Sequence, residues 1–204
     1  MVVLASNGLS SPALHQEVRK YIHGGKAALV VTADNEYKAE NYHVARVTKE
    51  LEALGLTVAV FDFDIQTPVE LMEYDVVEMI GGNPYYLLQS IKIHGFQDVL
   101  KLFAEERILV GWSAGALVIG PTLSLIDQYT PEMNFMGLTD LTALNLTHVQ
   151  ILPHYNKFLP RKSAFEEKCA LYENEHGCNV IRINDGDGVI VDNGCIFVIR
   201  AEEI

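Results

Sequence analysis

Short apolar runs alternate with helix-like segments along the first half of this chain. The apolar runs fall at residues 2–6, 27–33, 57–61, 76–80 and 108–112. The segments between them carry the spacing or the start and stop signals of helices, at residues 12–23, 37–54, 84–91 and 97–106. Continuous apolar strands separated by helices are typical of a parallel sheet that is covered on both faces. We therefore expect an α/β fold with a mostly parallel sheet flanked by helices.

The remaining third of the chain is less regular. Residues 146–152 predict one more strand, and residues 163–175 predict a helix. Residues 180–200 hold short strand-like runs with glycine-rich turns, which indicate an antiparallel edge to the sheet. No repeat or linker interrupts the 204 residues, of which 49% are hydrophobic. We expect a single domain spanning residues 1–204.

The charge and the cysteine content of the chain indicate which partners and which compartment to expect. The net charge of −12 argues against a nucleic-acid partner, because no stripe of lysine and arginine is available for phosphates. The three cysteines have no disulfide-like or metal-ligand spacing, which suits a reducing compartment. The amino terminus lacks a basic leader, and no apolar run is long enough to span a membrane. These features predict a cytoplasmic protein with no membrane partner and no cofactor.

The most informative motif is Gly-Trp-Ser-Ala-Gly at residues 111–115, which begins in the last two residues of the apolar run at 108–112. A strand that enters Gly-x-Ser-x-Gly and continues as a helix is the layout of a nucleophile elbow. The serine then lies on a sharp turn, and the glycines leave room for its backbone and for a substrate carbonyl. The motif predicts Ser113 as a nucleophile.

A serine hydroxyl needs a neighbouring base, and His154 is the preferred candidate. It follows Pro153 at the expected carboxyl end of a strand, where the active crevice of an open parallel sheet forms. His148 and His94 are the alternatives. A carboxylate must orient the imidazole, and spacing alone does not identify it, because Asp127, Glu132 and Asp140 all fall between the serine and His154.

A second motif, Gly81-Gly82-Asn83, ends the run at 76–80. A glycine pair there can present a backbone N–H to a developing oxyanion, and the N–H of Ala114 would be the second donor. The alternatives are a phosphate-binding turn, although no Walker lysine is present, or a turn that only needs glycine geometry. The sequence also lacks His-Glu-x-x-His and comparable spacings, so a metallopeptidase and a metal site are not expected.

Four motifs resemble, in their residues and in their order along the chain, those of the peptidase E family of serine aspartyl dipeptidases, which is related to cyanophycinase. They are the Gly-Trp-Ser-Ala-Gly run, the Pro-Thr pair at 121–122, the Gly-Gly-Asn turn and the Pro-His-aromatic step at 153–155. The resemblance implies a three-layer fold similar to class I glutamine amidotransferases. It implies Ser113 as nucleophile, His154 as base, and the Gly82 and Ala114 amides as oxyanion donors. Counted from the Pro-Thr pair, the family's aspartate falls on Gln128, so a one-residue slip gives Asp127, with Glu132 in reserve.

The resemblance further implies a short peptide substrate with an amino-terminal aspartate. Such a side chain calls for a cation, and Lys157, Arg161 and Lys162 follow the base. Arg161 and Asn83 are our candidate substrate contacts. Two other functions remain open on this sequence, an esterase-type serine hydrolase and a non-catalytic ligand-binding domain on the same scaffold. The oligomeric state is not indicated.

Overall fold

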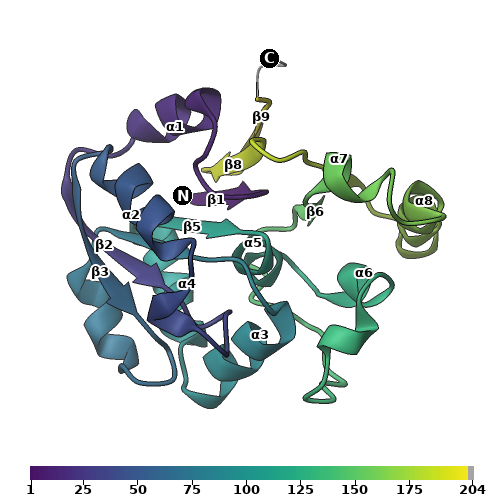
Figure 1. The fold of residues 1–204 in the computed structure, drawn as a ribbon, viewed down its shortest axis with the longest axis horizontal. Helices are drawn as coiled ribbons and strands as arrows, with labels where there is room; N and C mark the ends of the chain where they lie inside the picture. The colour runs from purple at the N-terminus through teal and green to yellow at the C-terminus, as the bar shows by residue number, and fades with distance from the viewer. Residues whose placement is uncertain (202–204) are drawn as a thin grey trace.

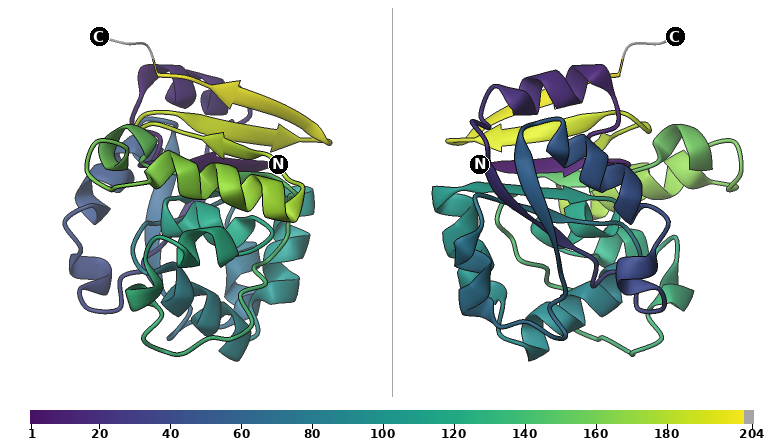
Figure 2. Two further views of the ribbon diagram at one scale, coloured as in Figure 1. Left: turned by 90° about the vertical axis from the view of Figure 1, so that its right-hand side faces the viewer. Right: turned by 60° about the vertical axis from the view of Figure 1, so that its left-hand side comes forward.

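The computed structural model describes residues 1–201, in which a central sheet carries helices on both faces (Figures 1 and 2). The strands are β1 (Val2–Ala5), β2 (Gly25–Val30), β3 (Leu56–Phe61), β4 (Val76–Met79), β5 (Ile108–Trp112), β6 (Gln150–Leu152), β7 (Val180–Arg182), β8 (Gly188–Asp192) and β9 (Cys195–Ile199). The α-helices are α1 (Pro12–Arg19), α2 (Val44–Glu52), α3 (Pro84–Ile93), α4 (Gln97–Glu106), α5 (Ala114–Ile119), α6 (Ser124–Asp127), α7 (Tyr155–Phe158) and α8 (Phe165–His176). Short 3₁₀ helices lie at η1 (Lys38–Glu40), η2 (Pro68–Glu73) and η3 (Pro131–Met133).

The main sheet has seven strands in the order β3-β2-β4-β5-β1-β8-β9. Its first five strands are parallel, whereas β8 pairs antiparallel with both β1 and β9. Every residue of β1 and β4 is buried, because helices cover both faces at the centre of the sheet. The predicted α/β fold with a mostly parallel sheet and an antiparallel carboxyl-terminal edge is therefore confirmed.

The helices pack in two neighbouring groups. On one face α1 lies beside α2, where the Arg19 guanidinium donates to the carbonyl of Ala53 at 2.9 Å. On the other face α3 contacts α5, and α5 also packs against β1, β4 and β5. This packing places the amino terminus of α5 at the carboxyl ends of the central parallel strands, which is the edge of the sheet where the predicted site residues gather.

Several predicted elements differ in extent or pairing. The helix expected over 37–54 is instead η1, a turn and α2, because Lys38 adopts a positive φ of 51° that an α-helix does not allow. The strand expected over 146–152 is reduced to β6. In the region expected to form the antiparallel edge, β7 instead pairs parallel with β6 in a separate two-stranded sheet. Of residues 146–152, only the three residues of β6 pair with a partner strand.

The small sheet has an apolar cluster of its own. Beside α5 in Figure 1, β6, α6 and α8 lie together at one side of the molecule. The buried residues that hold them are Leu125, Tyr129, Leu152, Phe165, Cys169, Tyr172 and Val180. This cluster fixes the segment that follows β6, and with it His154.

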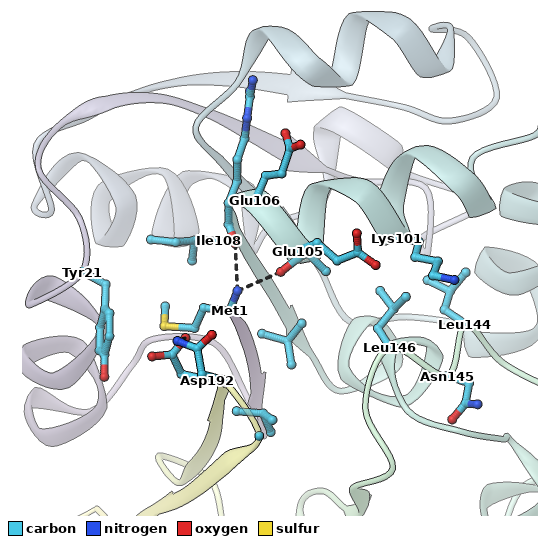
Figure 3. Close-up of a pocket in the computed structure, with 16 residues that line it drawn as sticks. Met1, Tyr21, Lys101, Glu105, Glu106, Ile108, Leu144, Asn145, Leu146 and Asp192 are labelled. Carbon is cyan, nitrogen blue, oxygen red and sulfur yellow. Dashed lines mark hydrogen bonds between the residues drawn. The ribbon is translucent and has the colours of Figure 1, made fainter.

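A wide hollow lies at the other end of the sheet. It has a volume of about 770 Å³ and is lined by Met1, Lys101, Glu105 and Asp192, among others (Figure 3). The Met1 ammonium group donates to the carbonyl of Ala104 at 2.8 Å inside it. None of the predicted catalytic residues lines this hollow, so its size does not mark the site. Within residues 1–201 no helix is long and apolar enough to cross a membrane.

Candidate active site

Ser113 lies on the sharp turn between β5 and α5. Its backbone has φ 50° and ψ −113°, a conformation that costs a non-glycine residue on the order of 1–3 kcal/mol. The Ser113 N–H donates to the carbonyl of Ala5 at 3.1 Å, which ties the turn to β1. A Cβ at Gly115 would lie 2.2 Å from the carbonyl oxygen of Met79, so only glycine lets α5 approach β4 this closely. The turn is therefore held in its strained form by the sheet on one side and by close helix packing on the other.

Two backbone amides face the same pocket as Ser113. Ala114 is the first residue of α5, so its N–H has no acceptor inside the helix. Gly82 follows β4 with φ 147°, and a Cβ there would lie 2.3 Å from the carbonyl oxygen of Ala33. The N–H of Gly82 has no hydrogen-bond partner among residues 1–201. Both amides are thus available to a ligand oxygen near Ser113.

His154 follows β6 and lies in the same pocket. Its backbone is left-handed, with φ 57° and ψ 31°, and its N–H donates to the Ser6 hydroxyl at 2.9 Å. The Nδ1 of its ring lies 2.6 Å from Oδ1 of Asp185. The hydrogen bond from His154 lowers the pKa of Asp185 below its usual range, against burial, which acts in the opposite direction. An ionised carboxylate on Nδ1 leaves the other ring nitrogen, Nε2, free to act as a base.

Ser6 completes the arrangement around the imidazole. It is fully buried directly after β1, and its hydroxyl donates to Oδ1 of Asp185 at 3.0 Å. The N–H of Asp185 in turn donates to the side-chain carbonyl of Asn156 at 3.1 Å. One serine hydroxyl therefore fixes both the backbone of His154 and the carboxylate that its ring contacts.

The predicted acid lies elsewhere. The carboxylate of Asp127 accepts a hydrogen bond from the Tyr85 hydroxyl at 2.9 Å, at the end of α6. Of the alternatives, Asp140 is exposed and pairs with Lys92 at 2.9 Å, and Glu132 is exposed on η3. The carboxylate that contacts the imidazole comes from beyond β7, so the assignment of Asp127 is corrected on this geometry.

Ser6 and Asp185 were missed by sequence reasoning. Each directly or closely follows a parallel strand, Ser6 after β1 and Asp185 after β7. The rule that carboxyl ends of parallel strands gather at one edge would have drawn attention to Ser6. Asp185 belongs to a run that the sequence predicts to form antiparallel strands, so the rule for parallel strands does not point to it.

A cavity of about 210 Å³ brings four of the predicted residues together. Ser113, His154, Gly82 and Ala114 all line it. Most of its remaining wall is apolar, formed by Pro84, Leu117, Ile126, Tyr129, Met133, Leu152, Pro153, Phe158 and Phe165. Lys157 and Lys162 also line it, and the Lys162 ammonium donates to the carbonyl of Tyr129 at 3.3 Å. The cavity thus combines an apolar wall, two unshielded amides and two cations.

The two candidate substrate contacts fall outside this cavity. The Asn83 side-chain oxygen caps α3 by accepting from the N–H groups of Tyr85 and Tyr86 at 2.9 and 3.1 Å. Its amide nitrogen donates to the carbonyl of Met133 at 2.8 Å. Asn83 therefore builds the turn that carries Gly82, while Arg161 is exposed and does not line the cavity.

No group of three or more histidine, cysteine, aspartate or glutamate side chains in residues 1–201 is placed to hold a metal ion. The arrangement is a serine, an imidazole, a carboxylate and two backbone donors. Such a set suits nucleophilic attack by a hydroxyl on a carbonyl carbon.

Comparison with known proteins agrees with this chemistry. The model of peptidase family S51 matches residues 2–199. The chain is 30% identical over 137 residues to an uncharacterized peptidase of Listeria monocytogenes, covering 65% of this chain and 67% of that protein. It is 26% identical over 147 residues to peptidase E of Escherichia coli, covering 70% of this chain and 61% of that protein.

Solved structures share the fold. A crystal structure of a putative peptidase E protein from Listeria monocytogenes superposes with a TM-score of 0.78 at 23% identity, over 98% of both chains. That of a peptidase from an acI-B1 actinobacterium gives a TM-score of 0.65 at 17% identity, over 99% of this chain and 94% of the other. At these identities the likeness concerns the fold alone.

Proposed function

This chain belongs to peptidase family S51, and from that premise we propose that it is an exopeptidase which cleaves short peptides through an acyl-enzyme on Ser113. Membership makes the chain a serine peptidase, a hydrolase that acts on peptide substrates. The observation that carries the assignment of residues is the 2.6 Å contact of His154 with Asp185 in the cavity that also holds Ser113. The match over residues 2–199 supports a single peptidase domain.

His154 is the general base in this proposal. Asp185 accepts the Nδ1 proton, and so fixes the tautomer in which Nε2 takes the proton of the Ser113 hydroxyl. The serine oxygen then attacks the scissile carbonyl carbon. The imidazolium that results is stabilised by the Asp185 carboxylate and gives its proton to the leaving amine. Water hydrolyses the acyl-enzyme by the same route.

The oxyanion that forms during the attack is stabilised by the amides of Gly82 and Ala114. The support for this role is that neither amide has an acceptor among residues 1–201 and that both residues line the cavity with Ser113. Donors that are already oriented need no rearrangement during the reaction, and one such donor contributes roughly 3–4 kcal/mol to transition-state stabilisation. The strained turn at Ser113 supports the elbow assignment, because strain of this kind gathers at active sites.

For the substrate we propose a preference for an amino-terminal aspartate. Lys157 and Lys162 line the cavity and supply the positive charge that a substrate carboxylate requires. The hydrogen bond from His154 is the main cause of the lowered pKa of Asp185, and the charge of Lys157 lowers it further. The charge of Lys157 therefore acts on the catalytic centre. Arg161, which lies outside the cavity, is not part of this proposal. The free cysteines fit a reducing compartment such as the cytoplasm.

The test is hydrolysis of Asp-Leu, Ala-Leu and Lys-Leu by the wild-type chain beside Ser113→Ala. We expect cleavage of Asp-Leu above the other two, and loss of nearly all turnover in the variant while its unfolding transition is unchanged. Equal rates on the three peptides would remove the aspartate preference. Turnover retained by Ser113→Ala would contradict the nucleophile, and cleavage of a nitrophenyl ester without any dipeptide cleavage would favour an esterase.

A further inference from the structure

A second hollow adjoins the catalytic cavity on the far side of Gly82. It has a volume of about 400 Å³, and Gly82 and Met133 line both spaces. Its other walls are the turn that follows β2, the segment that precedes α2, Trp112, and the two neighbours of Gly82, which are Gly81 and Asn83. We call this space the Asp34 hollow, after the acidic residue that lines it. Neither Ser113 nor His154 lines it.

Asp34 is the charged group of this hollow at neutral pH. The other ionisable side chains that line it are those of Tyr42 and His43. Burial lowers the pKa of His43, and the neighbouring charges of Arg46 and Lys157 lower it further, so the imidazole is neutral near pH 7. Tyrosine is uncharged in this range. The hollow therefore presents one full negative charge.

The Asp34 carboxylate stays ionised and lacks a cationic partner. Burial acts to raise its pKa, but hydrogen bonds from the Tyr37 N–H, the Asn41 amide and the Glu36 N–H, together with the nearby charge of Lys38, outweigh it and hold the pKa below its usual value. Within residues 1–201 Asp34 makes no ion pair. The nearby Lys38 ammonium contacts Asp62 at 3.1 Å instead and also pairs with Asp64.

The loop that carries Asp34 is fixed before any ligand arrives. Lys38 holds it against the segment after β3 through the pair with Asp62. Asp64 is itself held by the Tyr86 hydroxyl of α3 at 2.8 Å. The Ala33 carbonyl accepts the N–H of Asn83 at 2.8 Å, which joins the loop to the Gly82 turn. A carboxylate on a fixed loop binds a cation at a smaller cost in conformational entropy than one on a mobile loop.

The chemistry of the reaction places the scissile carbonyl between the two spaces. His154 must give its proton to the leaving nitrogen, so the scissile bond lies in the cavity that His154 lines. The side chain of the amino-terminal residue stays on the same side, where Lys157 and Lys162 lie. The carbonyl oxygen points at the amide of Gly82. The α-amine is then directed to the far side of Gly82, where a Cβ on that glycine would lie 3.0 Å from the backbone nitrogen of Asp34.

We propose that the Asp34 hollow binds the free α-ammonium group of the substrate's amino-terminal residue, with the Asp34 carboxylate as its acceptor. This inference rests on the proposed peptidase function and names the feature that makes the enzyme act at a free amino terminus. The α-amine is attached to the carbon next to the scissile carbonyl, so it enters the hollow when the carbonyl oxygen reaches Gly82. A blocked or longer amino-terminal chain loses this charge pair.

The test measures binding, so that it does not depend on turnover. Ser113→Ala is titrated calorimetrically with Asp-Leu and with succinyl-leucine, which is Asp-Leu without its amino group. We expect Asp-Leu to bind about 10- to 100-fold more tightly, the range for a hydrogen bond between two charged groups. Adding Asp34→Asn should abolish this difference by weakening Asp-Leu alone. Equal binding of the two ligands to Ser113→Ala would overturn the proposal.

Two further variants separate recognition from loop structure. Glu36→Gln removes an exposed carboxylate two residues away and should leave both affinities unchanged. Asp34→Ser keeps a short acceptor for the turn and should behave as Asp34→Asn does. A loss that is equal for both ligands in both Asp34 variants would mean that Asp34 only shapes the loop, and would overturn the proposal. Failure of the peptidase function itself would appear separately, as absence of hydrolysis by the chain with Ser113 intact.

Discussion

Two clusters of polar side chains border the turn at Ser113, and they differ in how their groups are satisfied. The first, which we call the histidine cluster, consists of Ser6, His154 and Asp185. Its members bond to one another at 2.6 to 3.0 Å. The Asp185 carboxylate is held ionised by the hydrogen bond from His154. This cluster lies at the carboxyl ends of the strands and opens into the catalytic cavity.

The second, the glutamate cluster, consists of Glu50, Glu78 and Trp112. Arg46 joins its members, since it pairs with Glu50 and lies 5.6 Å from the centre of the Trp112 ring. Both carboxyl oxygens of Glu78, Oε2 of Glu50 and Nε1 of Trp112 are buried and have no hydrogen-bond partner within residues 1–201. Burial, assisted by the charge of Glu50 and opposed by Arg46, raises the pKa of Glu78 to about 8.

The comparison shows that hydrogen-bond partners decide the charge state of a carboxyl group here. Asp185 receives donors from His154 and Ser6, and its pKa falls although it is half-buried. Glu78 receives none in the fully buried centre of β4, and it carries a proton at neutral pH. We conclude that the first group can serve charge-dependent chemistry, whereas the second is neutral and its ionisation opposes folding.

Removing the charge of the histidine cluster is expected to have the largest effect. Asp185→Asn keeps the size of the side chain but no longer holds His154 in the tautomer with a free Nε2. We expect kcat/KM for the best dipeptide to fall by about 10²- to 10⁴-fold. Chemical denaturation of the same variant is the control, because a loss of folding would also lower the rate. A decrease of less than about threefold would contradict the role of Asp185.

A change in the glutamate cluster should alter the stability of the protein and not its catalytic rate. The pKa of Glu78 is about 8 in the folded chain and close to 4.5 when unfolded, so the folded state binds the extra proton between these values. The free energy of unfolding therefore decreases as pH rises through this window, by up to about 1.4 kcal/mol per pH unit. Glu78→Gln has no such proton, so its free energy of unfolding should not show this decrease. The difference in free energy of unfolding between the variant and the wild type should therefore shift in favour of the variant by about 2–4 kcal/mol from pH 5 to pH 8.

Urea denaturation of both chains across that pH range measures the gain. The control is Glu52→Gln, an exposed glutamate of α2, for which we expect stability curves parallel to those of the wild type. If the curve of Glu78→Gln were also parallel, Glu78 would be ionised or hydrogen-bonded in the folded chain, and the contrast between the two clusters would fail.

Ser6 tests how much of the first cluster's order depends on a single hydroxyl. Ser6→Ala removes a donor to Asp185 and the acceptor of the His154 N–H. We expect kcat to fall by about tenfold, equivalent to ~1.4 kcal/mol, with KM nearly unchanged. Ser10→Ala, an exposed serine beyond the same strand, should change neither quantity; a change in KM alone would argue against positioning.

The central strands of the main sheet could be predicted from the sequence because they are buried on both faces. Apolar residues fill β1, β5 and the buried part of β2, and Glu78 is the one polar residue of β4. The separate pairing of β6 with β7 could not be predicted. Each has three residues, and what joins them is the apolar cluster beneath α8, which only the folded chain assembles.

The site divides in the same way. That Ser113, Ala114 and Gly82 lie around one cavity is predictable, because a strand followed by a tight glycine turn fixes backbone geometry locally. The partners of His154 come from two distant segments, one after β1 and one after β7. Several carboxylates lie between the serine and the histidine in the sequence, and nothing in their spacing indicates that the acid lies beyond the histidine. The contact between His154 and Asp185 forms only in the folded chain. The resemblance to the family pointed instead to Asp127, which lies in α6.

The smallest effect is expected at Asp127, and it is the sharpest test of the corrected acid. Asp127→Asn retains an oxygen that can accept from the Tyr85 hydroxyl, which lies 2.9 Å from the carboxylate. Because that contact does not include His154, kcat/KM should stay within about twofold of the wild type, while Asp185→Asn loses orders of magnitude. Tyr85→Phe, which breaks the same hydrogen bond from the other side, should cost about 1 kcal/mol of stability and leave the rate unchanged. If Asp127→Asn instead lost activity as severely as Asp185→Asn, both carboxylates would act on the imidazole during turnover. The histidine cluster would then extend to α6 in the working enzyme.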